Sequence, residues 1–210
     1  MKEKKQTRAD VEVQNVSQDG FAVLSKYRGA IMGMAALWIL FFHEWQKLFV
    51  DSGTIGEVEK YIQRIGFCGV DIFLFLSGIG LVFAISKGTV ASFYYRLLKR
   101  VFLPFLIVGI LRAVTEKWSF AVFWKNVLCI NFYQSNMYSF LWFVPMILTF
   151  YVLFPLYYKI FSKASNKLMF TGAVFLLWLM LTLCFRETLR SDLWGFTNRI
   201  PVFLFGIYAG

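Results

Sequence analysis

The only histidine of the chain, His43, lies in an apolar stretch and is the first candidate for chemistry. Ionisable side chains are costly within a membrane helix, so they are functional candidates where they occur. Arg28 precedes His43 by fifteen residues. On a helix, fifteen residues rise about 22 Å, and their side-chain directions differ by about 60°. Arg28 and His43 are therefore expected on one face of the helix. The alternative is that His43 is an interfacial residue at a helix end, beside Trp45.

Asp71 is the second candidate, because it stands early in another apolar stretch, residues 69–73. Consecutive membrane helices run antiparallel, so His43 and Asp71 are both expected within roughly 10 Å of the same membrane edge. A carboxylate at that depth could hold one imidazole nitrogen and leave the other free as a general base. The alternative is that Asp71 caps a helix at the membrane boundary.

A third group is the basic cluster Arg96, Lys99 and Arg100. Arg96 and Arg100 are four residues apart and therefore neighbours on one helix face. Such a cluster could bind the phosphates of a cytoplasmic coenzyme. The alternative is that these charges only set the topology. In the second apolar stretch, the small residues Ser77, Gly78 and Gly80 are interpreted as helix-packing positions.

The composition shows which elements must position these residues. Of the 210 residues, 59% are hydrophobic and only 16% are charged, and the apolar residues form long blocks. A soluble domain cannot hide that much apolar surface. The alternating pattern of a membrane barrel is missing, so helices must satisfy the backbone in lipid. The net charge is +10, and the basic residues lie between the apolar blocks. This position indicates that they set the membrane topology and do not bind nucleic acid.

Metal and disulfide chemistry are not expected. Cys68, Cys129 and Cys184 are odd in number and far apart, which fits neither a disulfide framework nor a zinc site. A lone histidine with scattered acids does not build a metal site either, so no metal is expected.

The blocks predict an all-α, polytopic transmembrane helix bundle of about five full spans plus a partial sixth. The full spans are expected at residues 30–49, 66–85, 97–114, 140–158 and 168–185, and the partial helix at 200–210.

The segments between the spans are expected to differ in character. Residues 1–22 should form a mobile polar tail, followed by a membrane domain over 23–210 that is incomplete at its C-terminus. Residues 51–64 should form a polar loop, and 118–133 an interfacial or re-entrant helix. The most basic segments then fall on one side, which predicts a multi-pass protein of the cell membrane with a cytoplasmic N-terminus.

Five stretches between about Leu24 and Gly210 form an ordered pattern. They are the pair Arg28 and His43 on one apolar helix, the Gly-Val-Asp to Ser-Gly stretch 69–78, the Phe-Tyr-Tyr-Arg to Lys-Arg stretch 93–100 with Pro104, Leu141-Trp142-Phe143 with Tyr151 and Phe154-Pro155, and Arg199-Ile200-Pro201 to Gly206. In this order and with these spacings, they resemble the acyltransferase 3 family of membrane proteins.

The resemblance implies transfer of an acyl group, often acetyl, from an acyl-CoA donor to a hydroxyl of a surface polysaccharide or glycoside. It implies that His43 is the catalytic base, that Asp71 supports the site and that Arg28 holds the donor or the site geometry. The basic cluster would lie near the donor's phosphates. The expected partners are therefore membrane lipid, the carbohydrate acceptor and acyl-CoA, and no nucleic acid.

Two departures from the family pattern accompany the resemblance. The separation of Arg28 and His43 is about one helical turn longer than in many members. Members also carry more transmembrane helices, so the chain is expected to be a C-terminally truncated member. The rival hypothesis is a non-catalytic polytopic protein, such as a polysaccharide exporter or transporter subunit. A transporter predicts ionisable residues along a path through several spans, whereas His43 and Asp71 at one depth favour a single site.

Overall fold

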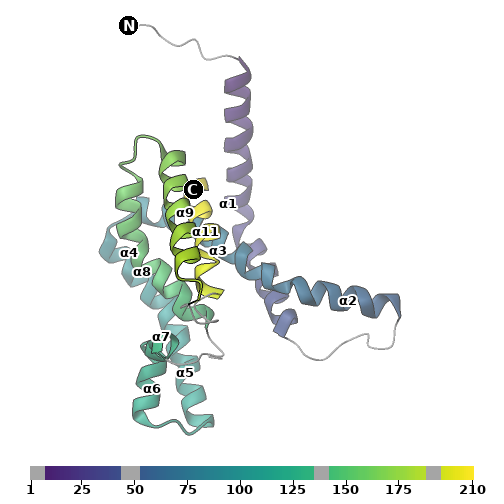
Figure 1. The fold of residues 1–210 in the computed structure, drawn as a ribbon, viewed down its shortest axis with the longest axis vertical. Helices are drawn as coiled ribbons and strands as arrows, with labels where there is room; N and C mark the ends of the chain where they lie inside the picture. The colour runs from purple at the N-terminus through teal and green to yellow at the C-terminus, as the bar shows by residue number, and fades with distance from the viewer. Residues whose placement is uncertain (1–7, 44–52, 135–141, 188–194) are drawn as a thin grey trace.

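The computed structural model describes residues 8–43, 53–134, 142–187 and 195–210, and these ranges contain helices and no strand. The predicted all-α class is therefore confirmed. In chain order the helices of Figure 1 are α1 (Arg8–His43), α2 (Thr54–Arg64), the 3-10 turn η1 (Ile65–Phe67), α3 (Cys68–Ser86), α4 (Val90–Leu97), the π-helical segment η2 (Leu98–Phe102), α5 (Leu103–Thr115), α6 (Phe120–Val127), α7 (Ile130–Gln134), α8 (Phe143–Phe161), α9 (Lys167–Cys184) and α11 (Ile200–Ala209).

Helix α3 forms the centre of the bundle. It is apolar on every side, and Leu74, Leu76 and Ile79 are at most 2% exposed, as expected for a helix surrounded by others. Helix α11 packs against it at Gly78, where a Cβ atom would lie 2.7 Å from the carbonyl oxygen of Phe203. Small residues that let two backbones approach are typical of helix contacts in membranes.

Aromatic rings hold α8 between α4 and α11. The ring of Phe150 stacks on that of Phe203 in α11, with centroids 4.7 Å apart. The ring of Phe154 stacks on that of Phe93 in α4, with centroids 5.7 Å apart. Such pairs add about 0.5–1.5 kcal/mol each beyond the burial of their area. They fix the face of α8 that is turned toward α3.

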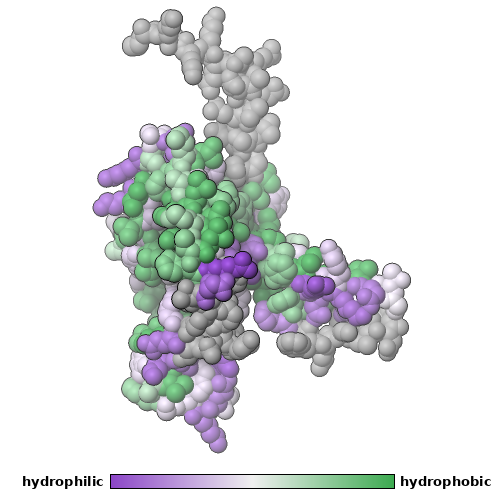
Figure 2. Space-filling model, viewed as in Figure 1, coloured by the Kyte–Doolittle hydropathy of each residue, from purple (hydrophilic) through white to green (hydrophobic). Residues whose placement is uncertain are grey.

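Three helices in the described ranges are long and apolar enough to cross a membrane: the continuous helix from Thr54 to Ser86, α8 and α9. Helix α9 exposes Leu176 and Leu183, and Figure 2 shows apolar side chains gathered over the α9 side of the bundle. The predicted first span is described only as far as His43. The predicted third span lies in a helix that runs from α4 through η2 into α5. The number of spans therefore stays a prediction.

Two segments expected to be irregular are helical. The predicted polar loop at 51–64 is wrong from Thr54 onward, because these residues form α2. Its exposed apolar residues Ile55, Val58 and Ile62 share one face. Their spacing is that of an amphipathic helix, but the polar composition of the segment led to the prediction of a loop. Residues 8–22, expected in a mobile tail, belong to α1. Residues 118–133 contain the short helices α6 and α7, neither long enough to cross a bilayer.

Candidate functional site

Helices α1, α3, α4 and α8 and the segment η2 enclose a cavity of about 190 Å³, named here the arginine cavity. Three arginines line it, and none of its described lining residues is acidic. The lining consists of Arg28, Met32, Ser77, Gly80, Leu81, Ala84, Phe93, Arg96, Leu97, Arg100, Val101 and Tyr151. Guanidinium groups so close together, without a carboxylate in the lining, repel one another and favour an anionic ligand.

Arg28 reaches the arginine cavity across a glycine of α3. Its guanidinium lies over Gly80 so closely that a Cβ atom there would overlap Nη1 and Cζ. Glycine therefore makes the room that Arg28 occupies. Sequence reasoning interpreted Gly80 as a helix-packing position, and the structure shows that it accommodates a candidate site residue.

Arg96 and Arg100 enter the arginine cavity from consecutive turns, as their spacing predicted. Arg96 Nη2 donates a hydrogen bond to the carbonyl oxygen of Ala84, 2.9 Å away, which ties α4 to the end of α3. Arg100 lies in the π-helical segment η2, a wider turn of a kind that often occurs at functional sites. Lys99, the third member of the basic cluster, is exposed and does not line the cavity.

Two hydroxyl-bearing residues in the arginine cavity were not among the predicted site residues. Ser77 is 3% exposed, and its Oγ makes no hydrogen bond of ordinary geometry among the described residues, the Tyr151 hydroxyl being the polar side chain with which it interacts. A buried hydroxyl without a partner costs free energy, so it marks a place where a ligand or water can bind. Tyr151 lies opposite on α8, four residues before Pro155. Proline has no N–H, so the carbonyl of Tyr151 lacks its helical partner.

Asp71 forms an ion pair with Arg199 near the start of α3. Arg199 Nη1 donates to Asp71 Oδ1, and the Arg199 guanidinium lies 5.6 Å from the ring centroid of Trp142. The Asp71 and Arg199 side chains are 32% and 15% exposed. Arg199 Nε is buried without a hydrogen-bond partner among the described residues. Sequence reasoning noted Arg199 and Trp142 inside family-like stretches but gave them no role.

His43 is oriented by its own helix. Its Nδ1 lies 2.8 Å from the carbonyl oxygen of Ile39, and its ring meets that of Phe42 edge to face. A carbonyl oxygen only accepts hydrogen bonds, so Nδ1 carries the proton of the neutral imidazole. Nε2 is then left with its lone pair. Among the described residues no carboxylate bonds to the exposed imidazole.

The structure does not bring His43 and Asp71 together. A Cβ atom at Gly69 of α3 would lie 2.8 Å from the carbonyl oxygen of Ala35, so Asp71 lies close to the level of Ala35. His43 is eight residues further along α1, or roughly 12 Å. Within the described ranges the carboxylate of Asp71 bonds to Arg199 instead. The hydrogen bond expected between His43 and Asp71 is therefore not formed, whereas the depth of the two residues in a membrane stays a prediction.

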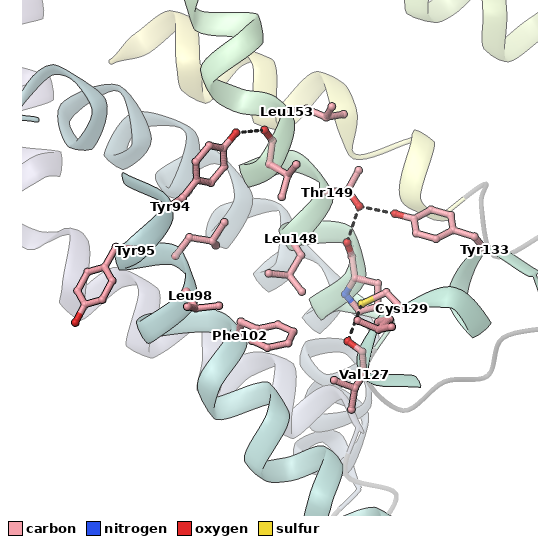
Figure 3. A pocket seen from close by; sticks show the side chains of 14 residues that line it. Tyr94, Tyr95, Leu98, Phe102, Val127, Cys129, Tyr133, Leu148, Thr149 and Leu153 are labelled. Carbon is pink, nitrogen blue, oxygen red and sulfur yellow. Dashed lines mark hydrogen bonds between the residues drawn. The ribbon is translucent and has the colours of Figure 1, made fainter. Parts of the chain in front are cut away.

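A larger cavity of about 650 Å³ lies between α4, η2 and α8 and is lined mainly by apolar side chains (Figure 3). Its tyrosine hydroxyls are satisfied: Tyr94 donates to the carbonyl oxygen of Val152, and Tyr133 bonds to Thr149. Burial raises the pKa of the Cys129 thiol in its wall to about 11. None of the described residues that line this cavity is charged, so they do not suit a phosphorylated ligand.

The helices and their apolar surfaces define a membrane protein. The chain belongs to the acyltransferase 3 family, because the model of that family's acyltransferase domain matches residues 31–210. This confirms the resemblance carried by the motifs. The match includes His43, Asp71 and the basic cluster, and it begins three residues after Arg28. No curated protein and no solved structure matches the chain.

Proposed function

We propose that this chain transfers an acyl group, normally acetyl, from acyl-CoA to a hydroxyl of a cell-surface carbohydrate or glycoside. The arginine cavity is the observation that carries the proposal. It combines three cations, a described lining without an acidic residue and the buried Ser77 hydroxyl, on the side predicted to face the cytoplasm. Coenzyme A carries a diphosphate and a further phosphate on its ribose, which suit clustered guanidinium groups.

In this proposal Arg28, Arg96 and Arg100 bind the donor's phosphates. Lys99, exposed beside them, attracts the donor to the cavity through its charge. Asp71 supports the site by holding Arg199 in place. The protein is a multi-pass protein of the cell membrane, with its N-terminus in the cytoplasm.

His43 acts as the general base. Its Nε2 accepts the proton of the acceptor hydroxyl while the hydroxyl oxygen forms a bond to the thioester carbonyl carbon. The carbon–sulfur bond then breaks, and the proton passes from the imidazole to the coenzyme A thiolate. The apolar helices keep bulk water from the thioester and so limit its hydrolysis.

The test uses membrane vesicles with the cytoplasmic face exposed and acetyl-CoA labelled on the acetyl group. The wild-type chain should move label into membrane glycan, whereas His43→Ala should not. Arg100→Gln should raise the KM for acetyl-CoA, and Lys159→Gln, an exposed cation outside the cavity, serves as the control. Label transfer that survives His43→Ala would remove His43 as the base, and no transfer by any form would favour the exporter hypothesis.

A further inference from the structure

One face of α3 lines the arginine cavity with small residues. Ser77, Gly80 and Ala84 belong to this face, because positions three, four and seven apart lie on one side of a helix. Arg28 lies over Gly80, and Arg96 donates a hydrogen bond to the carbonyl oxygen of Ala84. Ser77 is the inner end of the row, with 3% of its surface exposed. The arginines therefore contact two positions of this face, and the third position carries a hydroxyl.

The separation between the Arg28 guanidinium and Ser77 fits one shared ligand oxygen. The guanidinium occupies the place where a Cβ atom of residue 80 would stand. Cβ atoms three residues apart on a helix are about 5–6 Å apart. Two donors at that separation can both reach one oxygen atom, because each hydrogen bond spans about 2.7–3.0 Å. A ligand oxygen that binds Arg28 between these positions is therefore also within reach of the Ser77 hydroxyl.

The hydroxyl groups of Ser77 and Tyr151 have more hydrogens than acceptors. Ser77 Oγ makes no hydrogen bond of ordinary geometry among the described residues, and it interacts with the Tyr151 hydroxyl. A bond between the two hydroxyls uses one of their two hydrogens. Guanidinium groups only donate hydrogen bonds, and the described lining of the cavity contains no carboxylate and no side-chain amide. The second hydrogen is therefore left for a ligand.

We propose that the Ser77 hydroxyl donates a hydrogen bond to the phosphate oxygen that Arg28 binds, and that the Tyr151 hydroxyl orients Ser77 for this bond. The assignment rests on the proposed function and gives Ser77 a binding role that helix packing does not include. The ligand then meets only hydrogen-bond donors at this end of the cavity. Such a site selects a group that accepts hydrogen bonds and donates none, as an ionised phosphate does.

The test removes the hydroxyl of Ser77 in two ways. Ser77→Ala deletes it, and Ser77→Cys keeps the size of the side chain but leaves only a weak donor. Ser86→Ala is the matched control, since Ser86 lies on the same helix, is exposed and is not part of the cavity lining. The full chain in detergent is titrated with adenosine 3′,5′-bisphosphate, which carries phosphates of the donor, and with inorganic pyrophosphate. Thermal unfolding of each variant is measured without a ligand.

Ser77→Ala and Ser77→Cys should each weaken the binding of both probes about tenfold or more, and Ser86→Ala should leave it unchanged. Ser77→Ala should not lower the melting temperature of the ligand-free chain, because the hydroxyl that it removes lacks a well-formed bond within the protein. A hydroxyl that serves only the fold would give the reverse result, with unchanged binding and a lower melting temperature.

The two hypotheses can fail separately. The assignment of Ser77 is wrong if either variant binds the probes like the wild type, and the proposed function is untouched by that result. If pyrophosphate binds in a Ser77-dependent manner but the bisphosphate does not bind the wild-type chain, the coenzyme A donor is wrong and the role of Ser77 stands. If neither probe binds the wild-type chain, the cavity is not an anion site and both hypotheses are wrong.

Discussion

Gly80→Ala is a small change that should remove a single charge from the arginine cavity. The added methyl group would overlap the guanidinium of Arg28, which is the flexible end of its side chain and can swing away. The backbone of α3 need not move. Alanine is also favoured over glycine inside a helix by about 1 kcal/mol, so the change should not lower thermal stability.

The expected effect follows from the contact that is lost. One hydrogen bond between a guanidinium and a phosphate contributes about 1.5–3 kcal/mol. This converts to a rise of about 10- to 150-fold in the KM for acetyl-CoA. The kcat should stay near that of the wild type, because in the proposed function Arg28 binds a remote part of the donor equally well in the ground and transition states.

The assay is a double-mutant cycle with Arg28→Gln. Gly80→Ala should add nothing when Arg28 is already replaced, because both changes remove the same contact. Gly172→Ala on α9 is the control, since a Cβ atom there has no neighbour within 4 Å. Effects of Gly80→Ala and Arg28→Gln that simply add would refute the idea that Gly80 acts through Arg28.

Three further predictions follow from single contacts. Asp71→Asn should lower stability by about 1–3 kcal/mol in thermal unfolding, because it weakens the partner of the largely buried Arg199, and adding Arg199→Gln should recover part of that loss. At pH 8 Cys129 should react with iodoacetamide far more slowly than the exposed Cys184, and the rate at Cys129 should rise about tenfold per pH unit until near pH 11. Mass spectrometry measures both rates, and equal rates would contradict the burial of the Cys129 thiol. Gly78→Val should destabilise the chain by about 1–3 kcal/mol or more through overpacking against α11, and an unchanged melting temperature would contradict that close approach.

The sequence predicted the parts of the site that obey local rules. Arg96 and Arg100 lie together because a four-residue spacing places them on one face, whatever the rest of the chain does. Asp71 and His43 could be chosen as candidates because each belongs to a short contiguous stretch that resembles the family pattern. The helical class followed from the length and polarity of the apolar blocks.

The remaining parts depend on contacts between distant segments. Asp71 and Arg199 are 128 residues apart, and no periodicity links them. Gly80 makes room for Arg28 only because α1 crosses α3 at that level. The wrong prediction of a loop at 51–64 has another cause. The spacing of Ile55, Val58 and Ile62 indicates a helix, but the prediction followed the polar composition of the segment instead.

The two polar clusters along α3 differ in their charge balance, and this difference separates their roles. Arg199 has a carboxylate partner in Asp71, so that cluster is close to neutral without any ligand. Arg28, Arg96 and Arg100 share a cavity in which no described lining residue is acidic. Repulsion in the cavity opposes folding until an anion binds, whereas the paired cluster needs none. The arginine cavity and the balanced polar pair therefore lie at different levels along α3, and only the cavity would gain from binding an anion.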